Sequence, residues 1–188
     1  MALIQDLGVD GDGILQPLLK NRWRVNFLGL AGDPDPLKVQ AITCDRPKIE
    51  FAEIKLDRYN STAYVAGKHA FQPMNIVFEA DTGGAVFNTI QQQMNLQQSI
   101  IGNFPAPRLP AAIGGAVYKF AIRLESLDGD NTVLEMWIIE SAYFSNVDYE
   151  NWDYAANESV KVNCTIRYDQ ARQILSGISV KATGGAGA

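Results

Sequence analysis

The stretch that decides the fold is PKIEFAEIKLDRYNSTAYVAGKHAFQPMNIVFEAD, residues 47–81. Its two ends predict β-strands, because KIEFAEIKL and PMNIVFEAD are rich in β-branched and aromatic residues. The second end also alternates, with Met74, Ile76 and Phe78 on one face. Residues 58–70 between them are polar, aromatic and too irregular for a clear strand or helix. We therefore predict a long excursion between two strands.

Outward from this stretch, the same alternation recurs along the chain. Residues 21–29, 117–124 and 159–169 alternate apolar with polar side chains, and VLEMWIIESAYFSNV is long enough to run past a small sheet. LKVQAIT, residues 37–43, also predicts a strand. Turn sequences such as GDPDP and DGDN separate these runs. Six or seven strands joined by turns predict a mainly β protein, an antiparallel sandwich or barrel.

One segment predicts an α-helix. GGAVFNTIQQQMNLQQ places Val86, Phe87, Ile90 and Met94 at steps of three and four, with glutamines elsewhere. This spacing is typical of an amphipathic helix, here over about residues 84–98. Asp81 or Thr82 is placed to accept hydrogen bonds from the N–H groups of its first turn. We expect this helix to flank the sheets.

Length and composition indicate one domain with flexible ends. The chain has 188 residues, 47% of them apolar, and a formal charge of −5. We divide it into an N-terminal arm (1–20), a β-sandwich domain (21–175) with a Pro/Gly-rich connector at 100–116, and a flexible tail (176–188). The acidic balance argues against tight wrapping on nucleic acid. No apolar run reaches the ~18 residues of a membrane-spanning helix, so we expect no membrane binding.

Few residues are available for catalysis or metal binding. The chain has one histidine, His69, and two cysteines, Cys44 and Cys164. A site built on several histidines, a CxxC motif and a cysteine-rich zinc site are therefore excluded within one chain. Neither GKH at 67–69 nor DGDN completes a phosphate or calcium loop. We expect no enzymatic activity and no cofactor, and reduced cysteines in the core, with an inter-subunit disulfide left open.

Two surface patterns suggest contacts with a partner. Nine acids and no Lys or Arg lie between Leu124 and Val160, which is either a solvated face or a surface that repels polyanions or pairs with a basic partner. Aromatic residues also lie in or beside predicted loops, either covering the ends of the sandwich or forming an interface. These aromatic residues are Tyr59, Tyr64, Tyr143, Phe144, Tyr149, Trp152 and Tyr154.

Residues 47–81 resemble the signature region of tail tube proteins from contractile-tailed bacteriophages. The shared features are an Arg/aromatic/Asn segment (58–60), a Val-Ala-Gly-Lys step (65–68), Pro73 and Asp81. The C-terminal part is similar as well, with a Phe-Ser-Asn-Val turn at 144–147 between two strands. The resemblance covers roughly residues 21–30 and 39–172.

This resemblance implies a two-sheet antiparallel sandwich with one flanking α-helix. Its inner sheets would join into a continuous β-barrel in a hexameric ring, and rings would stack into the inner tail tube of a virion, assembled in the host cytoplasm. The implied partners are other copies of the chain, the sheath protein outside, a baseplate initiator, and tape-measure protein and DNA in the lumen. The type VI secretion tube protein is related in fold.

The resemblance also implies that the 57–70 loop contacts neighbouring subunits. The candidate interface residues are Arg58, Tyr59, Asn60, Tyr64, Gly67 and Lys68. Fixed negative charge would keep a lumen from holding DNA. The candidate lumen-facing acids are Glu53, Glu79, Glu135 and Asp169. Two alternatives stay open: the tube of a type VI secretion or other contractile injection system, and a monomeric β-sandwich that binds a ligand or is an unrecognised hydrolase.

Overall fold

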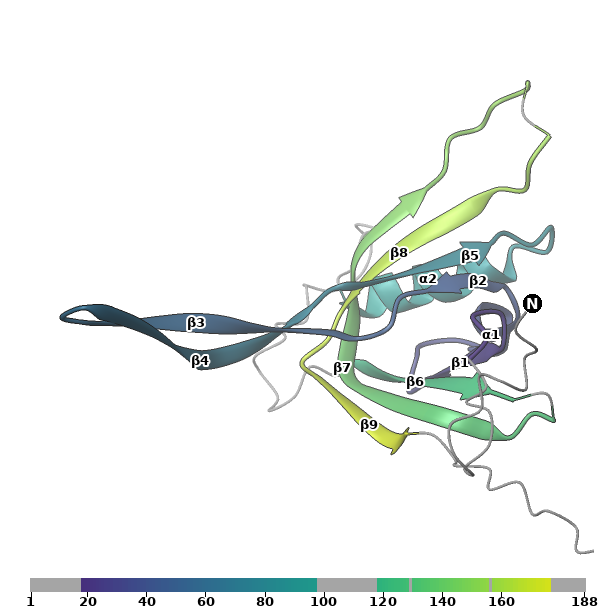
Figure 1. The fold of residues 1–188 in the computed structure, drawn as a ribbon. Coiled ribbons are helices and arrows are strands. Elements are labelled where there is room, and N and C mark those ends of the chain that lie inside the picture. Colours follow the sequence, from purple (N-terminus) through teal and green to yellow (C-terminus); the bar gives the residue numbers. More distant parts are fainter. Residues whose placement is uncertain (1–17, 98–117, 129, 156, 177–188) are drawn as a thin grey trace, which may run out of the picture.

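The computed structural model describes residues 18–97, 118–128, 130–155 and 157–176 (Figure 1). The described residues form a mainly β, antiparallel structure, as the alternation predicted. The predicted connector at 100–116, residues 1–17 of the predicted arm and residues 177–188 of the predicted tail lie outside them. No helix in the described part of the chain is both long and apolar enough to cross a bilayer.

Two sheets face each other. Sheet A contains β1 (Trp23–Leu28), β6 (Phe120–Leu127), the first half of β7 (Val133–Tyr149) and β9 (Gln170–Ser176). Sheet B contains β2 (Ala41–Cys44), β5 (Met74–Glu79), β8 (Lys161–Arg167) and the second half of β7.

Strand β7 is shared by the two sheets, which confirms the prediction that this strand runs past a small sheet. It pairs with β6 and β9 up to Ala142, and with β8 from Tyr143 onward. Ser141 has a positive φ of 58° between the two halves. Figure 1 shows β7 passing from one layer into the other.

The core lies between the sheets and follows the alternation in the sequence. Met74, Ile76 and Phe78 of β5 are buried, as predicted, and their neighbours across the sheet are Ile166, Cys164 and Val162 of β8. Sheet A buries the inward residues of β1 and β6 in the same way. These are Val25, Phe27, Phe120, Ile122 and Leu124. Each such side chain contributes roughly 1.5–3 kcal/mol on leaving water.

The predicted helix is present as α2 (Ala85–Gln97), packed against the sandwich through Val86 and Ile90. Asp81 supplies the cap, because its carboxylate accepts hydrogen bonds at 3.0 Å from the backbone N–H groups of both Ala85 and Val86. These bonds favour the ionised carboxylate and lower the pKa of Asp81.

The strand predicted at residues 37–43 is wrong in its first half. A short helix, α1 (Asp35–Val39), precedes β2, which begins at Ala41. Pro36 fits the first turn of a helix, where a missing N–H costs nothing. Leu37 is fully buried, and α1 contacts α2. Strand β9 was also missed, since the prediction ended the last strand at residue 169.

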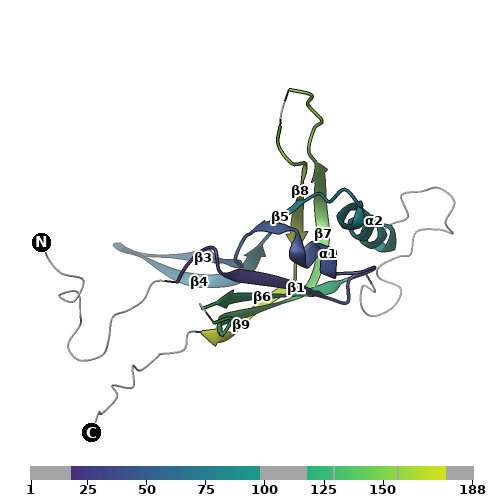
Figure 2. The ribbon, with the colours of Figure 1, turned by 90° about the vertical axis from the view of Figure 1, so that its right-hand side faces the viewer.

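The irregular excursion predicted at residues 58–70 is also wrong. Strand β3 (Lys48–Arg58) and strand β4 (Ser61–Gln72) form a regular antiparallel hairpin of their own. Figure 1 shows this hairpin extending far from the body, and Figure 2 shows the same molecule from the side. A shift of register near Gly67 breaks the alternation in β4, which explains why the sequence pattern concealed the strand.

Candidate assembly interface

The hairpin is held together by pairing between its own two strands. The register runs from Lys48 opposite Gln72 to Arg58 opposite Ser61, and Tyr59 and Asn60 form the turn. Eleven residues of extended strand span about 35 Å. Nearly every side chain along both strands is exposed. A two-stranded ribbon of this length is marginal in water without something to pack against.

A bulge in the hairpin depends on Gly67. Between the pairs Phe51–His69 and Glu53–Ala66, β4 contains one more residue than β3. A Cβ atom on Gly67 would lie 2.9 Å from the carbonyl oxygen of Ala52, closer than real contacts allow. Gly67 therefore lets the two backbones approach closely, which any larger residue would prevent.

The hairpin has two apolar faces that point in opposite directions. Below the bulge, the paired residues Ile49–Phe71 and Phe51–His69 share one side, which we call the root face. Beyond it, the pairs Ile54–Val65 and Leu56–Ala63 share a side, which we call the tip face. Because side chains alternate along β3, odd-numbered Phe51 and even-numbered Ile54 lie on opposite sides.

The root face is anchored to the body of the protein. The ring of Phe71 lies 5.5 Å from that of Tyr168, and the backbone N–H of Lys48 donates to the Tyr168 hydroxyl at 3.3 Å. His69 stands between Phe51 and Phe71, with ring centroids 6.1 and 5.5 Å away. His69 is therefore part of an aromatic row on the root face. These contacts fix the hairpin where it leaves the body.

The tip face is open to solvent and has no anchor on the described body; on the root face, Phe51 is also 58% exposed. Ile54, Leu56 and Val65 are 50%, 43% and 48% exposed. The other side of this part of the hairpin is polar, where Lys55 and Thr62 bind the Asp57 carboxylate at 3.1 and 3.0 Å. An exposed apolar surface backed by a polar one is typical of an interaction site.

The structure places all six candidate interface residues on the hairpin, but in different surroundings. Arg58 ends the tip face, and Tyr59 and Asn60 form the turn, where Tyr59 is fully exposed. Tyr64 lies on the polar side, opposite Lys55. The remaining two, Gly67 and Lys68, lie at the bulge.

The four candidate lumen acids are not brought together. Glu53 is exposed on the hairpin, whereas Glu79 is half-buried on β5, opposite Lys161 of β8. Asp169 lies in the turn between β8 and β9 and pairs with Lys119. Glu135 lies on the inward side of sheet A and is 8% exposed.

Glu135 belongs to a buried polar cluster that the sequence did not reveal. Its carboxylate binds Arg46 and accepts hydrogen bonds from the indole of Trp137 at 2.5 Å and from Gln173 at 3.1 Å. Such contacts join residues far apart in the chain, so spacing alone could not find them. Glu125 is similarly buried, beside Arg24 and Arg123.

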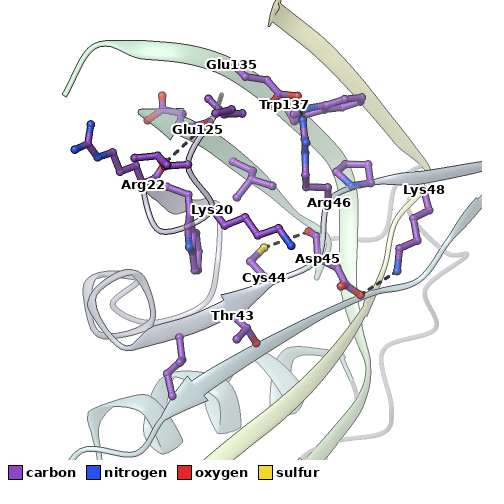
Figure 3. Close-up of a pocket in the computed structure, with 17 residues that line it drawn as sticks. Lys20, Arg22, Thr43, Cys44, Asp45, Arg46, Lys48, Glu125, Glu135 and Trp137 are labelled. Atoms are coloured by element: carbon purple, nitrogen blue, oxygen red, sulfur yellow. Dashed lines mark hydrogen bonds and ion pairs between the residues drawn. The ribbon is translucent and has the colours of Figure 1, made fainter. Parts of the chain in front are cut away.

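A cleft of about 620 Å³ opens beside this cluster (Figure 3). Trp23 and Trp137 line it, together with the segment from Ile42 to Lys48 that leads into the hairpin. Its two buried carboxylates pair with arginine, Glu125 with Arg24 and Arg123 and Glu135 with Arg46. Burial raises the pKa of the Cys44 thiol to about 12, so it is not a nucleophile near neutral pH. The described residues contain no cluster that could hold a metal ion.

The described sheets also have open edges. Strands β1 and β9 each pair on one side in sheet A, and β2 does so in sheet B. Open edges present unpaired N–H and C=O groups, which favours pairing with another chain unless something covers them.

Comparison with solved structures finds the same fold. A chain of the anti-feeding prophage cap, which terminates the tube, has a TM-score of 0.67 at 15% identity, covering 89% of this chain and 97% of that one. A chain of the sheath–tube complex of the PVC extracellular contractile injection system has a TM-score of 0.57 at 16% identity, covering 95% and 100%. The SPP1 tail tube has a TM-score of 0.51 at 11% identity, covering 86% and 80%.

No family model and no curated protein matches the chain. The chain thus has the fold of the tube and cap proteins of contractile injection systems and of a phage tail tube, as the resemblance in its sequence implied.

Proposed function

We propose that this chain is a structural subunit whose copies assemble into the tube of a contractile, phage-like tail. The observation that carries the proposal is the β3–β4 hairpin, a long projection whose apolar tip face is not covered by the part of the chain that the structure describes. A monomer would expose this surface permanently. In an assembly, a neighbouring copy covers it, and burial contributes about 25 cal/mol per Å².

The open edges support a ring. In a ring of copies, the edge of one sheet can pair with the edge of the next, and closing the ring removes the exposed edges. We propose six copies per ring, following the family resemblance, with rings stacked into a tube and a sheath protein outside. The resulting particle is a virion tail, assembled in the host cytoplasm from a baseplate initiator.

The tube would act as a passive conduit for DNA, with tape-measure protein in its lumen before ejection. Glu53, Glu79 and Asp169 remain candidates for the lumen wall, since their carboxylates are exposed or half-buried. The carboxylate of Glu135 is covered by Arg46, which makes Glu135 the weakest of the four candidates.

The test is negative-stain electron microscopy of the purified full chain, dilute and concentrated, in low and moderate salt. Hollow tubes of stacked rings are the expected result. Leu56→Asp, which puts a charge on the tip face, should abolish them. Val39→Asp is the matched control, because Val39 is also an exposed apolar residue but lies on α1. Tubes that are equally abundant in both variants would contradict the assignment of the hairpin.

A second candidate is a cap that terminates a tube. Cap and sheath–tube terminator chains have TM-scores of 0.67 and 0.62, higher than the 0.57 for the chain of the sheath–tube complex. A terminator would form single rings that do not stack at any concentration, so the same micrographs separate the two candidates. The tube of an injection system would carry protein rather than DNA. Analysis of the cargo in isolated particles distinguishes it from a phage tail tube.

A further inference from the structure

A second projection carries exposed aromatic residues. The chain between β7 and β8 projects beyond the sandwich; we call its described residues, 148–155 and 157–160, the acidic arm (Figure 1). Trp152 is 84% exposed and Tyr154 is fully exposed. The base of the arm is ordered by backbone contacts, since the N–H of Lys161 donates to the Glu150 carboxylate at 3.1 Å. Large rings in such a position bury nothing in the monomer.

The acidic arm combines these rings with unbalanced negative charge. Its acids are Asp148, Glu150, Asp153 and Glu158, and the sequence has no Lys or Arg from residue 125 to residue 160. Within the described part of the chain, no ion pair engages these four carboxylates. The arm therefore suits a partner surface that is both apolar and cationic.

The tip face of the hairpin has that composition. Ile54, Leu56 and Val65 form its apolar part, and Arg58 lies on the same side at its outer end. Aromatic rings pack well on branched aliphatic side chains, and an arginine beside them can pair with a carboxylate or lie over a ring. The two surfaces match in polarity, in charge and in their lack of cover.

The two surfaces belong to one chain but do not meet within it. Figure 1 shows the hairpin and the acidic arm leaving the body in different directions, and Tyr59 and Tyr154 at their ends are both fully exposed. A contact between them must therefore join two copies. When the hairpin and the arm of one copy engage two different neighbours, the contact is head-to-tail, and such contacts generate closed rings or helical stacks.

We propose that the tip face of one copy docks on the acidic arm of a neighbouring copy, with Trp152 and Tyr154 against Ile54 and Leu56 and with Arg58 facing Asp153. This inference rests on the proposed function and names the partner of each surface. Aromatic residues and arginine dominate the energetics of protein interfaces, so a few residues suffice to carry the contact. The complementary charge orients the encounter.

Reciprocal charge reversal tests the pairing. Arg58→Glu and Asp153→Lys should each raise the protein concentration needed for assembly by at least about tenfold, the effect of ~1.4 kcal/mol. A 1:1 mixture of the two variants should assemble again, because each altered surface then meets its complement. The double variant should also recover. Single variants that assemble like the unaltered chain, or a double variant that is no better than either, would overturn the proposal.

A cross-linking measurement separates this inference from the tube assignment. Asn60→Cys in one population and Ala155→Cys in another should form a disulfide-linked dimer when the full-length chains are mixed. The matched control replaces Ala155→Cys with Thr82→Cys, which is also exposed but lies before α2. A dimer without tubes in the micrographs would support the docking and reject the tube. Tubes with no more disulfide-linked dimer than the control would support the tube and reject the docking.

Discussion

The hairpin and the sandwich both contain apolar residues that alternate with polar ones, but these apolar residues are exposed in the hairpin and buried in the sandwich. In β5 and β8, which pair in sheet B, the alternating apolar residues lie side by side on the inner face of the sheet and are fully buried. In β3 and β4, residues of the same kinds alternate on either side of the bulge but stay exposed, because the ribbon extends away from the body. An apolar pattern therefore predicts that a surface is buried, but it does not tell whether the same chain or a neighbouring copy buries it.

The largest expected effect is on the sandwich. Phe78→Ala would leave a cavity at a fully buried position and cost about 3–5 kcal/mol of unfolding free energy. Leu56→Ala on the tip face should change the stability of the dilute monomer by less than about 0.5 kcal/mol. Urea denaturation of both variants measures this contrast. Similar losses in the two would mean that the hairpin is packed in the monomer.

A substitution at the bulge should impair assembly through the hairpin without lowering the stability of the core. Gly67→Val brings a side chain against the Ala52 carbonyl, which forces the two strands apart and disrupts the tip face. We expect assembly to be lost while the main thermal transition stays within a few degrees. Sedimentation velocity and thermal melting report the two properties. Ala66→Val, one residue earlier, is the control that adds bulk at a regularly paired position.

A single charge at the end of the hairpin should affect assembly alone. Arg58→Glu should prevent tube growth and leave the fold intact, because Arg58 is exposed and ends the tip face. Lys38→Glu makes the same change in charge at an exposed position on α1 and should assemble normally. Circular dichroism checks the fold, and light scattering follows growth. Normal tubes from Arg58→Glu would remove this residue from the interface.

The helix cap should give a smaller, pH-dependent effect. Hydrogen bonds from Ala85 and Val86 lower the pKa of Asp81, so its ionised form stabilises the folded state above the unfolded pKa of about 4. This contribution is lost as the pH falls through the lowered folded pKa. Asp81→Asn should therefore lower the melting temperature at pH 7, and the difference from the unaltered chain should shrink at strongly acidic pH. An unchanged difference would show that charge plays no part in the cap.

The smallest effect concerns the two thiols. Burial raises the pKa of both Cys44 and Cys164 to about 12, so almost no thiolate is present at pH 8. Labelling by a disulfide reagent should be slow in the folded chain and fast in denaturant. Cys164 is buried in the core, and Cys44 is partly buried against it. Fast labelling of the native chain would contradict the burial.

Regular periodicity was predictable from the sequence, and interruptions were not. The alternation in β5, β6 and β8 and the spacing of α2 predicted these elements, because one side of each faces the core. Strand β4 was missed because the bulge at Gly67 shifts its alternation midway. Helix α1 was missed because five residues carry little periodic signal.

At the candidate interface, the sequence likewise predicted which segment is involved but not how its residues are arranged. The resemblance located all six candidate residues, and the structure places them on one projecting hairpin. It could not assign them to faces, because that depends on register and on the bulge. The pairing of Glu135 with Arg46 and of Glu125 with Arg24 joins segments about a hundred residues apart, which no local pattern reveals. The lumen acids remain a prediction.

The central claim is that other copies cover the hairpin. Hydrogen–deuterium exchange of the unaltered chain, compared between dilute monomer and concentrated assembly, tests it most directly. We expect the amides of residues 48–72 to become strongly protected on assembly, while those of β5 in the core change little. An assembly whose hairpin exchanges as fast as in the monomer would contradict it.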